Sequence, residues 1–424
     1  MLKDYKDLGM AKYAPGGKVI STVDVSLGRR EMPRKTGIEG LYYITHVNNL
    51  PSIFEKGILS HAAVEREGVQ YTPIYDSGIV SSRREKRLPN GQSLWDYANL
   101  YFQPRNAMLY RVVHSPNLDV SSIAILFIKP EIIQRSDIFV TSGNAASNTS
   151  EFYSSEKVKQ FISSIRKEID KDWWSDTDGS KRKMMAECLV PDRVLPKYIR
   201  AIYVGNQKAA SALKTRIPSE VELIVDTYRF FLPQWKQSIS HNISLIKGDM
   251  FLSKMQTLTI SVNCVGVMGK GLASTTKYRF PDVYVEYQDR CKSKRLRMGY
   301  PYIHRRETSV LYDLSDDPSA LRDLDSQTWF LIFPTKNHWK NDSDLNGIDQ
   351  GMQWLARNYK KEGITSVALP ALGCGLGKLD WSDVGPMMCR YLAQMDIKSA
   401  VYLPMNQSIP EEYLTTNFLL SSHG

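Results

Sequence analysis

The chain has 424 residues, 42% of them hydrophobic and 24% charged, which is typical of a soluble globular protein with two domains. No apolar run approaches the roughly 18 residues of a membrane-spanning helix, and residues 1–18 lack the apolar core of a secretory signal. The five cysteines form no Cys-x-x-Cys pair and no cluster with histidine, which argues against disulfides and structural zinc. We therefore expect a cytoplasmic protein that binds neither a metal nor a membrane.

The net charge of +10 is unevenly distributed along the chain. Residues 1–240 contain 34 Lys and Arg against 26 Asp and Glu, whereas residues 241–424 contain 21 against 19. A basic surface is either simply solvated or binds nucleic acid, and charge alone leaves both possibilities open. A nucleic-acid partner, if there is one, belongs to the first half.

The N-terminal region begins with a basic segment and continues with regular elements. Residues 1–40 contain PGGK and RREMPRK and predict a poorly ordered extension that could contact DNA. Residues 41–61 predict a strand, a helix that ends at Gly57 and a second strand. Aromatic residues between 71 and 102 lie on both sides of a run of basic residues at 83–87, a pattern typical of a groove for single-stranded nucleic acid.

Four further segments of the first half combine polar, aromatic and basic residues. They are SSRREKRLP (81–89), LWDYANLYFQPRNAMLYRVV (94–113), FVTSGNAAS (139–147) and KMMAECLVPDRVLPKYIRAIYV (183–204). Together with ITHVNNL (44–50), they resemble DarT, a toxin that transfers ADP-ribose from NAD to a base in single-stranded DNA. The resemblance covers about residues 40–232 and implies an α+β ADP-ribosyltransferase-like domain over 41–236, with thymine as the expected acceptor.

The resemblance also implies roles for individual residues. Glu187 corresponds to the catalytic glutamate: a carboxylate beside the oxocarbenium-like ribose can orient a hydroxyl and accept a proton from the incoming base. Arg84 is assigned as the active-site arginine, with Arg83 as the alternative. NAD, which is consumed as a substrate, is assigned to Tyr43, Thr45, His46, Asn49, Arg83 and Tyr101.

One assigned residue departs from the family pattern, and three further residues are assigned to contacts with DNA. Tyr43 stands where the family pattern His-x-x-His has its first histidine, and the tyrosine hydroxyl could replace that hydrogen bond. Residues 141–147 have the small, polar character of a substrate-recognition loop, so Asn144 and Ser147 are assigned to DNA. Arg105 is assigned to DNA as well, with a structural role as the alternative.

The second half alternates strand and helix patterns. Short β-rich runs occupy 243–249, 257–266, 328–335, 364–372 and 400–405, and helical patterns occupy 345–363 and 382–396. This alternation predicts a mixed or parallel sheet covered by helices, with ligand loops at the strand ends. Two glycine-rich loops, VNCVGVMGKGLAS (262–274) and ALGCGLGKLDW (371–381), follow strands and lack nucleoside-triphosphate spacing. Such loops either form ordinary turns or direct backbone N–H groups at a phosphate.

Three motifs of this half resemble a macrodomain, the α/β fold that binds ADP-ribose. They are GD (248–249), VNCVGVMGKGLA (262–273) and PALGCGLGKLDW (370–381), and the resemblance covers 242–405. FPTKNHW (333–339) matches the FPTKxHW marker of DarG, the antitoxin that removes ADP-ribose from DNA. The resemblance implies a macrodomain, a mixed sheet between helices, over 237–424, with Lys336 as the catalytic residue. A lysine side chain can protonate the leaving base as the ammonium or, as the neutral amine, attack the ring-opened anomeric carbon.

The macrodomain resemblance implies an ADP-ribose site in which Asp249 accepts a hydrogen bond from the adenine amino group and Asn263 holds the distal ribose. The glycine loops would surround the diphosphate. The implied set is Asp249, Met250, Asn263, Gly266, Met268, Gly269, Lys270, Gly271, Thr335, Gly373, Cys374, Gly375, Leu376 and Gly377.

The whole chain thus resembles a DarT–DarG pair in one polypeptide, which in the family serves growth control and defence against phage. Two other functions stay open: transfer of ADP-ribose to protein, and a macrodomain that binds ADP-ribose without cleaving its bond to DNA. A separate antitoxin of the family has a toxin-binding region beyond its macrodomain, but this chain ends at Gly424, soon after the strand near 400–405. We expect hydrolysis to be the main restraint, and a monomer.

Overall fold

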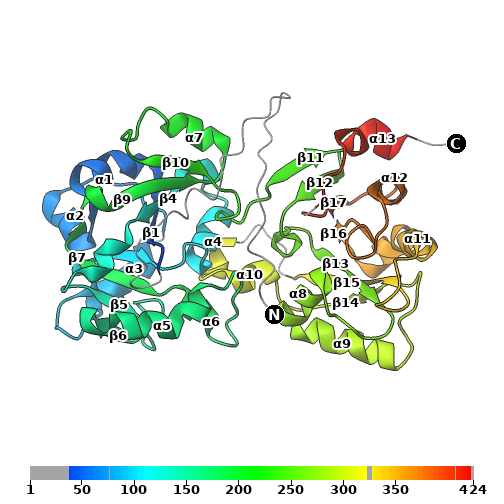
Figure 1. Cartoon of the computed structure of the whole chain (residues 1–424), viewed down its shortest axis with the longest axis horizontal. Coiled ribbons are helices and arrows are strands. Elements are labelled where there is room, and N and C mark those ends of the chain that lie inside the picture. The colour runs from blue at the N-terminus through cyan, green and yellow to red at the C-terminus, as the bar shows by residue number, and fades with distance from the viewer. Residues whose placement is uncertain (1–37, 76, 322–326, 406, 422–424) are drawn as a thin grey trace.

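The computed structural model describes residues 38–75, 77–321, 327–405 and 407–421, which form two halves, each built around its own β-sheet (Figure 1). Residues 1–37 of the predicted basic extension lie outside the described residues. In the described part of the chain, no helix is both long and apolar enough to cross a membrane.

The first half contains an eight-stranded sheet in the order β10-β9-β4-β1-β3-β7-β5-β6. Neighbouring strands are antiparallel except β10 and β9. All six residues of β4 are buried, because helices cover both faces of the sheet at its centre. The strands are β1 (Leu41–His46), β3 (Tyr97–Tyr101), β4 (Ile123–Ile128), β5 (Phe139–Thr141), β6 (Phe152–Ser154), β7 (Glu187–Pro191), β9 (Ile199–Val204) and β10 (Glu222–Val225).

Short helices and a small two-stranded sheet complete this half. The predicted helix that ends at Gly57 is present as α1, and Gly57 has a φ of 93°, which favours glycine. The two-stranded sheet pairs β2 (Ile58–Leu59) with β8 (Arg193–Val194). The helices are α1 (Leu50–Lys56), α2 (His61–Glu67), α3 (Ser77–Glu85), α4 (Ala107–His114), α5 (Val158–Ile169), α6 (Ser180–Met184) and α7 (Gln207–Leu213). The 3₁₀ turns are η2 (Val47–Asn49), η3 (Leu94–Asp96), η4 (Val120–Ser122), η5 (Pro130–Gln134), η6 (Ser155–Lys157) and η7 (Pro196–Tyr198).

The second half contains a seven-stranded mixed sheet in the order β11-β12-β17-β16-β13-β15-β14, which confirms the predicted α/β architecture. The five inner strands run parallel, so the loops after them meet at one edge of the sheet. The first strand, β11, spans the predicted domain boundary at 236/237. The strands are β11 (Trp235–Ser238), β12 (Ile243–Lys247), β13 (Thr257–Asn263), β14 (Tyr302–His304), β15 (Trp329–Lys336), β16 (Ser366–Pro370) and β17 (Lys398–Tyr402).

Helices cover both faces of this second sheet (Figure 1). The predicted helix over 345–363 is present as α11 and stops at Gly363 in a left-handed conformation. The helices are α8 (Gly271–Arg279), α9 (Pro281–Lys292), α10 (Val310–Leu314), α11 (Leu345–Glu362), α12 (Trp381–Leu392) and α13 (Thr416–Leu420). The 3₁₀ turns are η8 (Met250–Leu252), η9 (Pro318–Leu321) and η10 (Glu411–Leu414).

The two halves are packed against each other through a shared apolar cluster. Tyr110 and Phe231 of the first half belong to the same buried cluster as Phe251 and Phe280 of the second. Helix α10 lies beside α4 between the two sheets, as Figure 1 shows. The halves therefore form one structure, with apolar contact between them.

Candidate active sites

Glu187, at the start of β7, is the centre of a buried charged group. Its carboxylate is fully buried and accepts a hydrogen bond from the backbone N–H of Ala145 at 2.8 Å. Arg83 donates to Oε2 at 2.8 Å and to Oε1 at 3.4 Å, and the arginine side chain is only 12% exposed. Burial would lower the pKa of Arg83, but the charge of Glu187 raises it above its ordinary value. A bidentate ion pair thus holds the carboxylate in one orientation.

The structure does not place Arg84 beside Glu187. Arg83, the alternative, occupies the position that was expected for Arg84. The Arg84 side chain is 57% exposed, forms an ion pair with Glu65 and lies 4.6 Å over the ring of Trp95. Consecutive residues on an α-helix point about 100° apart. Only one of two adjacent arginines in α3 can therefore face Glu187, and the fold selects the first.

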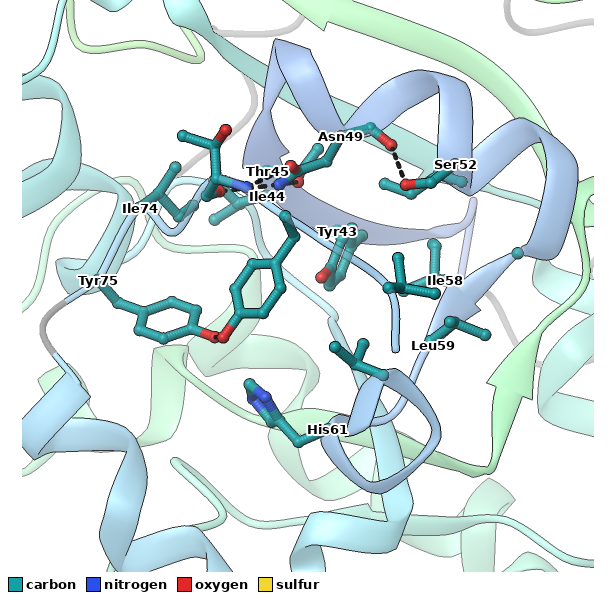
Figure 2. Close-up of a pocket in the computed structure, with 16 residues that line it drawn as sticks. Tyr43, Ile44, Thr45, Asn49, Ser52, Ile58, Leu59, His61, Ile74 and Tyr75 are labelled. Atoms are coloured by element: carbon teal, nitrogen blue, oxygen red, sulfur yellow. Dashed lines mark hydrogen bonds between the residues drawn. The ribbon is translucent and has the colours of Figure 1, made fainter. Parts of the chain in front are cut away.

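A pocket lies between β1, α1, α2 and the segment 69–75, and Figure 2 shows its lining. Tyr43, Thr45 and Asn49, three of the residues assigned to NAD, line this pocket. The Asn49 amide donates to Thr45 Oγ1 at 3.1 Å and to the carbonyl of Thr72 at 2.9 Å, and accepts from the N–H of Thr72 at 2.7 Å. Asn49 therefore fixes the distance between two walls of the pocket. Burial raises the pKa of Tyr43 to about 12, so its hydroxyl is a neutral donor.

The other residues assigned to NAD lie elsewhere. Tyr101 is buried and sits opposite Glu187 in the β3–β7 register, so it belongs with Arg83 to the carboxylate centre. His46 is not among the lining residues; its Nδ1 accepts from the N–H of Asn48 at 3.1 Å and caps η2. Of the six residues assigned to NAD, three line the pocket, two lie beside the Glu187 carboxylate and one caps the 3₁₀ turn η2.

His61 is a pocket residue that the sequence analysis did not single out. Its ring stacks on Trp95 at a centroid distance of 4.2 Å. The same ring meets Tyr75 edge-on at 5.9 Å, and Figure 2 shows these two residues in the pocket. Burial lowers its pKa to about 4, and the charges of Arg83 and Arg84 act in the same direction. A neutral imidazole therefore faces the pocket beside the Arg83–Glu187 pair. The sequence carries no local signal for this placement, because it depends on how α2 packs against α3 and η3.

The predicted recognition loop, 141–147, contacts the carboxylate centre directly. Its Ala145 N–H binds Glu187, and the Asn144 side chain accepts from the N–H of Ala146, within the same loop, at 2.9 Å. The ammonium of Lys86 donates to the carbonyl of Ser147 at 3.3 Å. The loop thus connects the basic segment after α3 with the carboxylate centre.

Arg105 does not lie on an accessible surface. It is 5% exposed, and its guanidinium lies 4.0 Å over the ring of Tyr228 and 4.5 Å over that of Phe231. The structure supports the alternative, structural role for this arginine, because two aromatic rings enclose its charge.

In the second half, two predicted ligand residues hold the loops at the sheet edge. Asp249 Oδ1 accepts from the N–H of Phe251 at 3.0 Å, and Oδ2 accepts from Arg279 at 2.8 Å. The Asn263 side chain donates to the carbonyl of Val267 at 2.6 Å and accepts from Tyr287 at 3.0 Å. Asn263 therefore shapes the first glycine loop from within.

The two glycine-rich loops lie side by side. A side-chain carbon added at Gly271 would approach Leu376 Cδ1 to 3.3 Å, so the loops touch. Gly266, Gly271 and Gly373 have φ values of 80°, 59° and 78°, which favour glycine. Lys270 directly precedes α8 at its N-terminus, where backbone N–H groups are free to meet an anion.

The remaining residues assigned to ADP-ribose differ in accessibility. Met250, Met268, Thr335 and Cys374 are buried, whereas Leu376 is exposed at the loop tip. A side chain at Gly377 would collide with Ser343, which keeps the second loop compact. A side-chain carbon added at Gly375 would meet nothing within 4 Å, and one at Gly269 would meet only Val267 Cγ1 at 3.8 Å, so both positions leave room beside the loops.

Lys336 lies at the end of β15, between the two loops. Its register partner on β13 is Asn263, and its ammonium donates to the carbonyl oxygens of Asn341 at 2.7 Å and Leu376 at 3.4 Å. Trp339, in the turn that follows, is 51% exposed. Among the described residues, no cluster of three or more His, Cys, Asp or Glu side chains could hold a metal ion. Lys336 thus places an ammonium beside the two glycine-rich loops.

Comparisons with known proteins identify the families of both halves. The family model described as "ssDNA thymidine ADP-ribosyltransferase, DarT" matches residues 42–231, and the model "Macro domain" matches residues 323–388. A Thermosipho africanus protein named "DNA ADP-ribosyl transferase-DNA ADP-ribosyl glycohydrolase fusion protein" is 53% identical over 383 residues, which cover 90% of this chain and 98% of the relative.

A solved structure and a second relative extend this result. The structure "Thermosipho africanus DarTG in complex with ADP-ribose" has a TM-score of 0.81 and 52% identity, and covers 90% of this chain and 99% of that one. A Mycobacterium tuberculosis "DNA ADP-ribosyl glycohydrolase" is 35% identical over 162 residues, 38% of this chain and 42% of its own length. The chain therefore belongs to the family of fused DarT–DarG proteins, which join a DNA ADP-ribosyl transferase to a DNA ADP-ribosyl glycohydrolase.

Proposed function

We propose that the first half transfers ADP-ribose from NAD to a thymidine base in single-stranded DNA and that the macrodomain of the second half removes it. The observation that carries the first activity is the buried pair of Arg83 and Glu187, with Arg83 close enough that, besides burial, its charge lowers the pKa of His61, which lines the pocket. The match to the DarT family supports DNA, and thymidine within it, over protein as the acceptor. The Lys336 ammonium at the loops supports hydrolysis over simple binding.

For the transferase, we propose that NAD occupies the pocket of Figure 2, where the Tyr43 hydroxyl and the neutral His61 offer donors and acceptors and Asn49 holds the walls in place. Each carboxylate oxygen has two lone-pair sites. Oε1 of Glu187 binds Ala145 and Arg83, whereas Oε2 binds Arg83 alone. Oε2 therefore keeps one site for a ribose hydroxyl or for the proton of the incoming base.

Access to this carboxylate requires movement of Arg83, because Glu187 is fully buried beneath it. A buried, preorganised carboxylate stabilises the positive charge that develops on ribose as nicotinamide leaves. The Arg83 guanidinium is then close enough to stabilise a phosphate oxygen of the donor. The loop with Asn144 and Ser147 is proposed to meet the DNA base, because its backbone already contacts Glu187.

For the hydrolase, we propose that the two glycine loops surround the diphosphate and that Lys336 acts at the bond between ribose and base. The ammonium is held by two neutral carbonyl oxygens, so no carboxylate neutralises it within the described residues. It can therefore deliver a proton to the leaving base, and the neutral amine that results from proton loss can attack the opened ribose. Exposed Trp339 offers a stacking surface for a neighbouring base of the DNA strand.

The domain bounds remain a proposal, 41–236 and 237–424. The pairing of β11 with β12 supports a boundary slightly earlier, before Trp235.

One experiment tests both activities. Protein with Lys336→Ala is incubated with NAD and single-stranded oligonucleotides that contain all four bases, and the product is digested and identified by mass spectrometry. We expect ADP-ribose on thymidine alone, and its removal when wild-type protein is added. Labelling of protein in place of DNA would overturn the proposed acceptor, and a stable DNA adduct in the presence of wild type would overturn the hydrolase.

A further inference from the structure

The connection between α5 and α6 of the transferase half reaches across to the macrodomain. Trp174 is buried, and its indole N–H donates to the carbonyl of Leu314 at 3.0 Å. Nearby, Arg111 of α4 donates to Asp316 at 2.8 Å in a largely buried ion pair. These contacts dock the two halves in a defined arrangement, because each polar group finds its partner in the other half.

The residues just before Trp174 contact an arginine of the macrodomain. Arg279, the last residue of α8, has its guanidinium 4.1 Å from the centre of the Trp173 ring and 3.6 Å from the carboxylate of Asp172. Its side chain is only 10% exposed. A cation held between an aromatic face and a carboxylate, away from water, has little freedom to adopt another rotamer.

The same guanidinium donates to Asp249 Oδ2 at 2.8 Å. The other oxygen of Asp249 is used by the N–H of Phe251, so Arg279 and the backbone together fix the plane of this carboxylate. One lone-pair site stays on Oδ2 for a further donor. Trp173 also meets the edges of Phe251 and Phe280 at 6.4 and 5.7 Å. The transferase half thus supplies two of the groups that surround Arg279, which in turn contacts Asp249.

Asp249 is the residue proposed to accept the adenine amino group of ADP-ribose, and α8, which ends at Arg279, begins in the first glycine loop. We propose that Asp172 and Trp173 of the transferase half are positioning residues for the adenine subsite of the macrodomain. This inference rests on the proposed function of Asp249. It gives the fusion a physical role: the hydrolase reaches full affinity for ADP-ribose only when the transferase is docked on it.

The test uses the full chain with Trp173→Ala or Asp172→Asn and measures binding of two ligands by calorimetry. ADP-ribose has the adenine 6-amino group, and inosine diphosphate ribose lacks it. We expect wild type to prefer ADP-ribose by about tenfold, the usual value of a hydrogen bond to a charged group. Both variants should lose most of this preference, and the KM for ADP-ribosylated oligonucleotide should rise while kcat stays within twofold.

Matched controls separate positioning from general damage. Asp176→Asn changes the same connection, but Asp176 pairs with Lys181 inside the transferase half, so it should leave the preference intact. Trp173→Phe keeps an aromatic face for Arg279 and should restore most of the preference. Unchanged transferase activity, measured with Lys336→Ala added, shows that each variant is folded.

The outcomes distinguish the two hypotheses. If wild type binds both ligands equally, Asp249 does not read the adenine amino group and its proposed role fails. If wild type prefers ADP-ribose and the Trp173→Ala and Asp172→Asn variants keep that preference, the positioning role of the transferase half is wrong.

Discussion

Replacing each of the two adjacent arginines of α3 by alanine, in separate variants, tests the assignment of the transferase centre most directly. Arg83→Ala removes the guanidinium that donates twice to the buried Glu187 carboxylate. Arg84→Ala removes a neighbour of equal charge and equal length that pairs with exposed Glu65 and covers Trp95. The two variants therefore have the same net charge and differ only in which side of the helix loses its cation.

The structure gives different magnitudes for the two changes. Loss of a preorganised donor at a reacting centre lowers kcat about 10²–10³-fold, and Arg83→Ala leaves only the Ala145 N–H on the Glu187 carboxylate. An exposed ion pair contributes at most about 1 kcal/mol. The Arg84–Glu65 pair is more than half exposed, so Arg84→Ala should change the transfer rate by less than about fivefold.

The assay follows transfer of label from NAD to a thymidine-containing oligonucleotide. Each substitution is made in a Lys336→Ala background, so that hydrolysis does not remove the product. Removal of one partner of a buried ion pair also costs about 3–5 kcal/mol of stability. Arg83→Lys is therefore included, because it keeps the charge but cannot donate to both oxygens in the fixed geometry of the guanidinium.

Equal losses of transfer rate in Arg83→Ala and Arg84→Ala would refute the reasoning, because the side of α3 that carries the arginine would then not matter. Retention of more than a tenth of the wild-type rate by both Arg83 variants would do the same.

Four further results are expected. Glu187→Ala abolishes labelling of DNA; because it also leaves the buried Arg83 without its partner, Glu187→Gln is measured beside it, and full activity of either variant would remove this carboxylate from the mechanism. In cells, Lys336→Ala turns a tolerated protein into a toxic one, and the further substitution Glu187→Ala restores growth. If cells with wild type and with Lys336→Ala grow equally and little DNA is labelled, hydrolysis is not what restrains the transferase. Trp339→Ala raises the KM for ADP-ribosylated oligonucleotide about tenfold, as expected for one lost stacking contact, with binding of free ADP-ribose unchanged; an equal loss for both ligands would place Trp339 in the ADP-ribose site instead. Because burial lowers the pKa of His61 to about 4, the unfolded chain binds its proton first as pH falls below about 6.5, so stability is present at neutral pH and is lost toward pH 4. Thermal unfolding should show a smaller loss in His61→Gln over this range, and identical pH profiles would count against a neutral, buried imidazole.

The local patterns of the sequence were enough to predict much of the fold. The parallel strands of the second half, the glycine loops after them and the helix stops at Gly57 and Gly363 all depend on short-range properties: periodicity, positive φ and strand ends. The motifs around Glu187 and Lys336 resembled two known families, and the comparisons confirmed the family. These features need no knowledge of distant contacts, and so the sequence carried them.

Only the tertiary structure decided which of two neighbouring arginines meets Glu187. Successive side chains of a helix point about 100° apart, and the packing of α3 decides which of them faces the sheet. The tertiary structure also decided that Arg105 is enclosed by aromatic rings and that His61 faces the pocket, since their neighbours come from segments far along the chain. The contact of Trp173 with Arg279 joins residues of two domains. No periodicity or motif encodes such a contact, because it arises only when two independently patterned surfaces are docked.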